Sequence, residues 1–111
     1  MRLTSEIFVS LLVRRVFSDG GFATVERRGA AAAGAVFVLA RDRSGGLRLF
    51  TPAPQSLASE EGDRRFVEEQ VADETALRAR LARELRFDPD VWTIEIETDR
   101  PETYLSIADP D

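Results

Sequence analysis

One apolar segment, residues 35–41 (Ala-Val-Phe-Val-Leu-Ala-Arg), constrains the fold of this chain more than any other feature. It is rich in valine and apolar on both faces, a pattern typical of a buried strand. A polar turn with two glycines at 42–46 connects it to a second apolar segment, 47–51, which predicts a hairpin. The chain is therefore expected to build a sheet around this hairpin.

Two helices are predicted on either side of the hairpin. The first covers residues 5–18, with Ser5 as its N-cap. The second runs from its cap Asp73 to Phe87 and ends because Pro89 follows. Both lengths are ordinary for helices of a globular domain.

Three more strands are predicted with unequal strength. Residues 91–97 alternate cleanly, with Trp92, Ile94 and Ile96 on one side. The patterns at 22–28 and 64–71 are weaker, and 64–71 also fits a helix. The alanine-rich stretch 29–34 fits either a loop or one helical turn.

These elements predict an α+β fold. We expect a mostly antiparallel sheet of four to five strands, covered by two helices in a single pair of layers. The length of 111 residues suits one domain, which we place at residues 1–99. Residues 100–111 carry two prolines and few apolar residues, so this tail is expected to fray.

Missing residue types restrict the chemistry of the chain. It contains no histidine, cysteine or lysine, and all 15 basic residues are arginines. The usual zinc and haem ligands, thiol nucleophiles and Ser-His-Asp triads are therefore absent, as are Schiff-base lysines. A general base at neutral pH would need a carboxylate whose pKa is raised by burial. We expect no catalytic residue, no metal site and no cofactor.

Charge and hydropathy restrict the partners. The net charge of −5 opposes general affinity for nucleic acid, which rests on cationic contacts to phosphates. The longest uncharged run, residues 29–40, is shorter than the roughly twenty residues needed to span a bilayer. No signal peptide is recognised near residues 7–13. We therefore expect a cytoplasmic protein without nucleic-acid or membrane partners.

The first predicted helix has a wide apolar arc of about 200° on a helical wheel. The tail or a loop can cover the surplus, or the surplus can meet a second copy of the chain, since large apolar patches seldom stay exposed. The candidate interface residues are Phe8, Val9, Leu12, Val13 and Val16.

Arginine doublets suggest a different function, the binding of an anion, because guanidinium groups bind carboxylates and phosphates bidentately. Arg15 falls inside the apolar arc, so it is expected to reach outward to solvent, to meet a carboxylate or to hold a bound anion. Gln55 follows two prolines on a turn and adds a polar side chain. The candidate binding residues are Arg15, Arg27, Arg28, Gln55, Arg64 and Arg65.

Several blocks together resemble a family of short bacterial proteins catalogued only as a domain of unknown function. The blocks include Gly20-Gly21-Phe22-Ala23, Pro52-Ala53-Pro54-Gln55-Ser56 and Arg83-Glu84-Leu85-Arg86-Phe87-Asp88-Pro89-Asp90-Val91-Trp92. The resemblance covers roughly residues 1–99. It implies a stand-alone domain and supplies no activity, cofactor or catalytic residue.

The sequence therefore leaves three functions open. The first is a non-catalytic interaction module whose partner is another protein or a second copy, bound through residues 5–18. The second is a binder of an anionic small molecule that uses the arginines named above. The third is a metal-dependent hydrolase built on carboxylates such as Glu84, Asp88 and Asp90, whose oxygens suit Mg²⁺.

Overall fold

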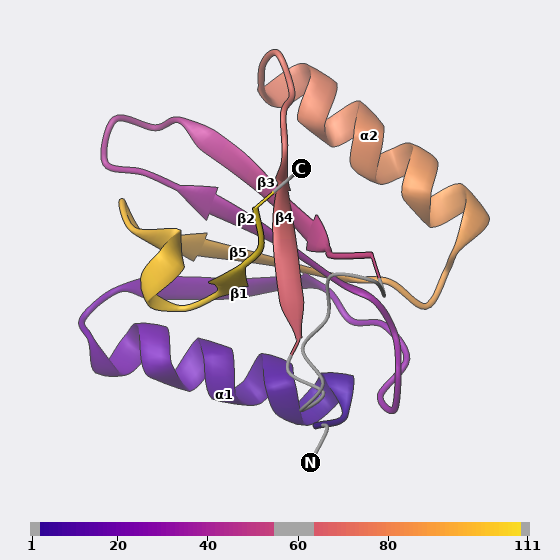
Figure 1. Ribbon diagram of the computed structural model, residues 1–111, viewed down its shortest axis with the longest axis horizontal. Coiled ribbons are helices and arrows are strands. Elements are labelled where there is room, and N and C mark those ends of the chain that lie inside the picture. The colour runs from indigo at the N-terminus through magenta and orange to yellow at the C-terminus, as the bar shows by residue number, and fades with distance from the viewer. Residues whose placement is uncertain (1–2, 55–63, 110–111) are drawn as a thin grey trace.

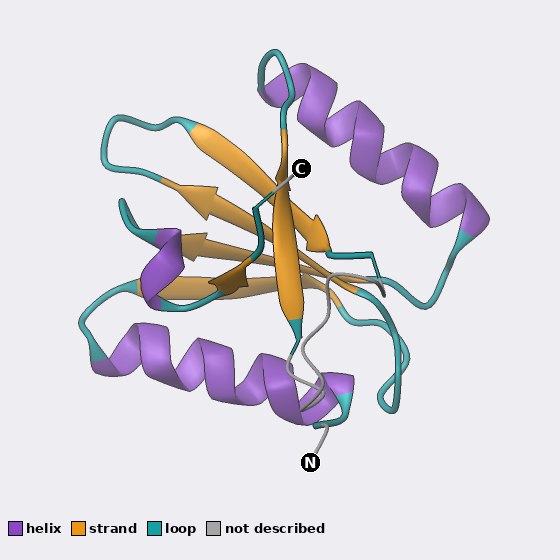
Figure 2. Ribbon diagram, viewed as in Figure 1, coloured by secondary structure: helices purple, strands orange, loops and turns teal. Residues whose placement is uncertain are grey.

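The computed structural model describes residues 3–54 and 64–109 (Figures 1 and 2). Within these ranges two α-helices, six strands and one 3₁₀-helix follow one another. Their bounds are α1 Ser5–Ser18, β1 Phe22–Arg27, β2 Val36–Arg41, β3 Leu47–Pro52, β4 Arg65–Glu69, α2 Glu74–Phe87, β5 Trp92–Glu97, η2 Pro101–Thr103 and β6 Ser106–Ile107. The predicted α+β class and both predicted helices are confirmed.

All six strands form one mixed sheet in the order β1-β5-β2-β3-β4-β6. Neighbours β2 and β5 run parallel, as do β4 and β6, and the other three pairs are antiparallel. The prediction of a mostly antiparallel sheet of four to five strands was wrong in these details. The error arose because β5 enters the sheet between β1 and β2, a pairing that no local sequence pattern shows.

The helices cover opposite faces of the sheet, so the domain has three layers rather than the predicted single pair (Figure 1). Alternate residues of β2 separate the two faces. Val38 packs with the α1 residues Val9 and Leu12, whereas Leu39 packs with Leu77 of α2. The strand that is apolar on both faces is therefore central and covered on both sides.

The start of α1 is fixed by the alanine-rich loop at residues 29–34. The N-cap is Thr4, whose side chain accepts a hydrogen bond from the Ile7 amide. Ser5, the predicted cap, is instead fully buried and donates to the Gly34 carbonyl. A Cβ at Gly34 would overlap the carbonyl oxygen of Asp90, so only glycine lets the loop approach the chain this closely.

The described part of the C-terminal segment, residues 100–109, docks on the sheet, which corrects the expectation of a frayed tail for these residues. Strand β6 pairs with β4, and Leu105 and Ala108 are buried. The hydroxyl of Tyr104 donates to Asp19 Oδ2 over 2.7 Å and ties this segment to the end of α1. Few apolar residues were enough because Leu105, Tyr104 and Ile107 all pack into the α1-side core.

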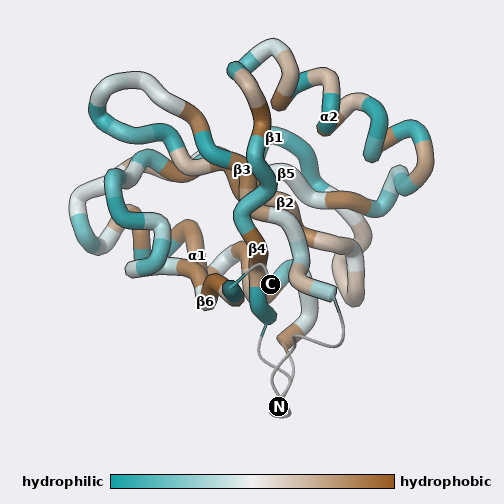
Figure 3. The backbone as a smooth tube through the Cα atoms, turned by 45° about the horizontal axis from the view of Figure 1, so that its top comes forward, coloured by the Kyte–Doolittle hydropathy of each residue, from teal (hydrophilic) through white to brown (hydrophobic). Residues whose placement is uncertain are grey.

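Helix α2 is the more polar of the two helices, and hydrophilic and hydrophobic residues alternate along it (Figure 3). The predicted cap is confirmed, since Asp73 Oδ1 accepts from the Ala76 amide over 2.8 Å. Leu77 and Leu81 are buried, and Leu85 is partly buried. No helix in the described ranges is both long and apolar enough to cross a membrane.

Candidate functional site

A hollow of about 280 Å³ lies between α1 and the β1–β5 edge of the sheet. We call it the Trp92 pocket. Apolar side chains form its floor: Val9, Val13, Val25 and Trp92. Polar and charged side chains form its rim: Glu6, Ser10, Arg14 and Arg28.

The floor of the Trp92 pocket is rigid because its indole is held from several sides. Trp92 is only 1% exposed, and its Nε1 donates to the Ala30 carbonyl over 2.8 Å. The polar atom of the ring is thus satisfied within the protein, and the ring offers the hollow only apolar surface. Trp92 is also the single tryptophan of the chain.

Two guanidinium groups lie at the rim, and only one of them has an ion-pair partner among the described residues. Arg28 pairs with Glu6, with Nη2 and Oε2 2.8 Å apart, and its Cζ lies 5.0 Å from the centre of the Trp92 ring. Arg14 forms no hydrogen bond or ion pair with any residue that the structure describes. The rim therefore combines one paired cation and one available cation above an apolar floor.

Most of the arginines predicted to bind an anion are engaged elsewhere. Arg27 donates to the Pro89 carbonyl over 2.8 Å, and Arg15 donates to the Thr103 carbonyl over 2.8 Å beneath Tyr104. Arg15 is exposed, so of its expected alternatives the outward orientation is the one found, and its partner is a backbone carbonyl of the docked C-terminal segment rather than a carboxylate.

The remaining predicted binding residues do not join Arg28 either. Arg64 donates to Ser5 Oγ over 2.9 Å and covers the Phe8 ring. Arg65 lies in β4, paired with Ser106 near the opposite edge of the sheet. Gln55 lies outside the described residues. The predicted set therefore does not converge, and of its described members only Arg28 lines the Trp92 pocket.

The predicted interface residues face inward rather than outward. Val9, Leu12 and Val16 are buried in the core, and Phe8 and Val13 are partly buried against it. Of the two alternatives for the surplus of the apolar arc, cover by the tail is the one found, because Tyr104, Leu105 and Ile107 pack into the same core as α1. The apolar residues of α1 that remain exposed are Ile7 at 48%, Leu11 at 43% and Phe17 at 49%.

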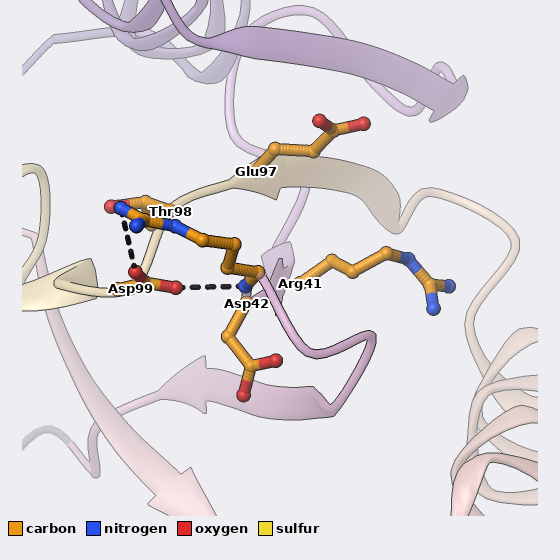
Figure 4. A pocket seen from close by; sticks show the side chains of 6 residues that line it. Arg41, Asp42, Glu97, Thr98 and Asp99 are labelled. Atoms are coloured by element: carbon orange, nitrogen blue, oxygen red, sulfur yellow. Dashed lines mark hydrogen bonds and ion pairs between the residues drawn. The ribbon is translucent and has the colours of Figure 1, made fainter.

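A second hollow, of about 220 Å³, lies at the β2–β3 turn and the end of β5 (Figure 4). Its acidic side chains serve the turn itself. Asp42 Oδ1 accepts from the Ser44 hydroxyl and from the amides of Gly46 and Ser44, and these hydrogen bonds, the hydroxyl first, lower the pKa of Asp42. Asp99 accepts from the amide of Arg43 over 2.8 Å. The residues of this hollow therefore stabilise the hairpin turn and the end of the sheet, and they give no sign of a binding site.

The carboxylates considered for Mg²⁺ are also in use. Glu84 pairs with Arg80 at 2.8 Å, and Asp88 Oδ1 accepts from the Asp90 amide over 3.0 Å. Within residues 3–54 and 64–109, no three His, Cys, Asp or Glu side chains are grouped as metal ligands. The geometry gives the hydrolase hypothesis no support.

Two members of the pocket, Arg14 and Trp92, were not predicted from the sequence as binding residues. Arg14 lies opposite the apolar arc of α1 and belongs to the Arg14-Arg15 doublet, but it was not among the candidate binding residues. Trp92 stood out only as one apolar residue of an alternating strand. The missing information was the pairing of β5 with β1, which brings Trp92 and Val25 beside α1.

Comparison with known proteins places the chain in a family. The family described as protein of unknown function (DUF1491) matches residues 3–106. The chain belongs to the DUF1491 family. This confirms the resemblance to a bacterial domain of unknown function, and none of the curated proteins matches the chain.

Solved structures share the fold of this DUF1491 protein. The solution structure of a protein from A. tumefaciens is 50% identical, with a TM-score of 0.85, covering 100% of this chain and 98% of that one. The crystal structure of a DUF1491 family protein from Caulobacter crescentus CB15 is 37% identical, with a TM-score of 0.79, covering 98% and 100%. An NMR structure of a DUF1491 family protein from the same organism is 38% identical, with a TM-score of 0.78, covering 98% and 99%.

Proposed function

We propose that this DUF1491 protein is a non-catalytic binding module that holds a small organic anion in the Trp92 pocket. The observation that carries the proposal is Arg14, a guanidinium without a partner among the described residues, at the rim of an apolar hollow. Arg28 stands across the same rim. An anion bound there would contact Arg14, which is available, and Arg28, which is paired with Glu6 at the surface.

The surroundings of the rim strengthen such a contact. Val13, Val25 and Trp92 exclude water from one side of the site, and an ion pair is stronger in a medium of lower dielectric than in bulk water. A guanidinium also offers parallel N–H donors that match the two oxygens of a carboxylate or phosphate. Binding sites of this kind typically join a mostly apolar wall to a few polar groups.

The proposal is of a non-catalytic protein, and its support is that the pKa shifts of the carboxylates named below are all downward. A carboxylate acting as general base near neutral pH needs a raised pKa. Here the pKa of Glu68 and of Glu74 is lowered by hydrogen bonds from Arg48 and Arg41, and the pKa of Asp42 is lowered by its turn. These groups stay ionised and paired, which suits structure better than proton transfer.

Thermal unfolding in the presence of anions tests the proposal. We expect hexanoate or inorganic phosphate to raise the melting temperature saturably, by about ten degrees at 100 times the dissociation constant. Arg14→Gln should abolish most of that rise. Arg83→Gln is the matched control, because Arg83 is an exposed helical arginine without a partner among the described residues. Equal shifts in both variants, or no shift with any anion, would refute the proposal.

Self-association through α1 is a second candidate, now on different residues. Ile7 and Leu11 lie one turn apart and are exposed, and Phe17 packs edge-on against the exposed Phe22 at 5.7 Å. Such apolar groups suit contact with a second copy or another protein. Sedimentation should show dimers that Leu11→Ser weakens, and a strict monomer at high concentration would remove this candidate.

A cytoplasmic location also belongs to the proposal. Its support is a cysteine-free composition, which matches compartments where thiols stay reduced and disulfides are rare. Fluorescence microscopy of a tagged chain in its bacterial host would test it, and a signal confined to the cell envelope would contradict it.

A further inference from the structure

In the Trp92 pocket one of the two arginines, Arg28, is already paired with a carboxylate, that of Glu6. This pair indicates which class of ligand the pocket binds. Resting on the proposed binding function, we infer that the ligand is an apolar monocarboxylate and that Glu6 is its internal competitor. In the free protein Glu6 holds Arg28 at 2.8 Å. The ligand carboxylate replaces Glu6 there and also pairs with Arg14.

The charge at the rim selects a monoanion. Arg14 and Arg28 carry two positive charges and Glu6 carries one negative charge, so the rim has a net charge of +1. One carboxylate neutralises it. A phosphate monoester carries a charge of about −1.5 to −2 near neutral pH, and its surplus would face the Glu6 carboxylate.

The floor of the pocket selects a hydrocarbon body. Val9, Val13, Val25 and Trp92 offer no free polar atom, since the indole N–H is already used by the Ala30 carbonyl. A polar ligand would lose its hydration without compensation against this surface. The volume of about 280 Å³ lies at the lower end of ligand pockets, so the body is a short alkyl chain or one ring.

The Glu6–Arg28 pair can exchange at low cost. The side chains of Arg28 and Glu6 are 66% and 50% exposed, and ion pairs this open contribute little to stability. Breaking this pair returns Glu6 to water. The new pair forms against the apolar floor, where the attraction is less screened. Exchange of partners therefore favours the ligand, while Glu6 pairs with Arg28 in its absence.

Trp92 reports the exchange directly. The Arg28 guanidinium lies over its ring at 5.0 Å, and the chain has no second tryptophan to obscure the signal. Movement of Arg28 and burial of a hydrocarbon against the indole both change the environment of the ring. Tryptophan emission thus gives a binding curve without a label.

The test compares three probes on three forms of the full chain. Hexanoate, its neutral analogue hexanamide and inorganic phosphate are titrated into the wild type, Glu6→Gln and Arg14→Gln, with Trp92 emission as the readout. We expect hexanoate to bind and hexanamide not to bind. Glu6→Gln should bind hexanoate about two- to fivefold more tightly, which corresponds to the loss of one exposed competing pair. Arg14→Gln should bind it at least tenfold more weakly.

Each result separates the inference from the proposed function. Hexanoate binding that is unchanged or weaker in Glu6→Gln overturns the competitor role, and Glu6→Ala checks that the result does not come from the glutamine. Phosphate binding that depends on Arg14, with no hexanoate binding, overturns the ligand class but leaves anion binding intact. Failure of all three probes on the wild type overturns both. Far-ultraviolet circular dichroism confirms that each variant is folded before it is titrated.

Discussion

The two faces of the sheet are covered in different ways. On the α1 side the contact is a continuous apolar core that includes Phe50, Phe66, Trp92 and Ile94. On the α2 side the apolar contact is confined to the centre, where Phe37, Leu39 and Leu49 meet the buried leucines of α2. Towards β1 the α2 side is covered by charged side chains.

Arg78 and Arg41 organise these charges. Arg78 contacts Glu26 of β1 at 2.8 Å and Glu95 of β5 at 3.5 Å. Arg41 contacts the same Glu95 at 2.9 Å and Glu74 at 3.2 Å. These hydrogen bonds raise the pKa of both arginines. One network thus links α2 to three neighbouring strands.

The difference shows how a helix with a narrow apolar stripe can cover a wide sheet, with apolar contacts at the centre and ion pairs beside them. Partly exposed ion pairs contribute little each, whereas buried apolar side chains contribute several kcal/mol in total. The α1 side therefore carries most of the stability. Local opening is expected to begin at α2, where fewer apolar contacts have to be broken.

The largest effect should come from the apolar face. Phe50 is fully buried in the α1-side core, so Phe50→Ala should lower the free energy of unfolding by about 3–5 kcal/mol. Urea denaturation measures the change, with Ala79→Ser on the exposed side of α2 as control. A loss below about 1 kcal/mol would mean that the α1 side is not the dominant core.

A smaller effect is expected from the charged side. Arg78→Gln removes contacts to Glu26, Glu74 and Glu95, and should cost about 1 kcal/mol at low salt. The loss should shrink in high salt because exposed charges are screened. Arg83→Gln, on the same helix but without a partner among the described residues, should leave stability unchanged. Equal effects of the two variants would contradict a role for the network.

The smallest effect concerns pH. The pKa of Glu74 is lowered in the folded protein, chiefly by its hydrogen bond from Arg41. Its contribution is therefore complete above the ordinary value of 4.5 and is lost as the pH falls through the lowered pKa. Unfolding between about pH 6 and 3 should show a shallower acid loss in Glu74→Gln than in the wild type. Identical pH profiles would place the acid sensitivity in other carboxylates.

Features that depend on interactions between residues near in sequence could be predicted, and features that depend on distant residues could not. The Asp73 cap, the β2–β3 hairpin and the inward side of β5 are set within a few residues, and their patterns were visible. The insertion of β5 and the docking of β6 depend on partners far along the chain. The same holds for the candidate site. Arg28 was predicted as a binding residue, whereas Trp92 comes to lie beside α1 and Arg14 only through the pairing of β1 with β5.

The place of β5 in the sheet also has a consequence for biosynthesis. Strands β1 and β2 are made early, yet each pairs with β5 rather than with the other. They cannot join one sheet until residues 92–97 have left the ribosome, and β4 gains its outer neighbour only from residues 106–107. Contacts so distant along the chain slow folding. Assembly of the whole sheet is therefore expected to wait for β5 and β6, whereas β2, β3 and β4, which pair in chain order, can associate earlier.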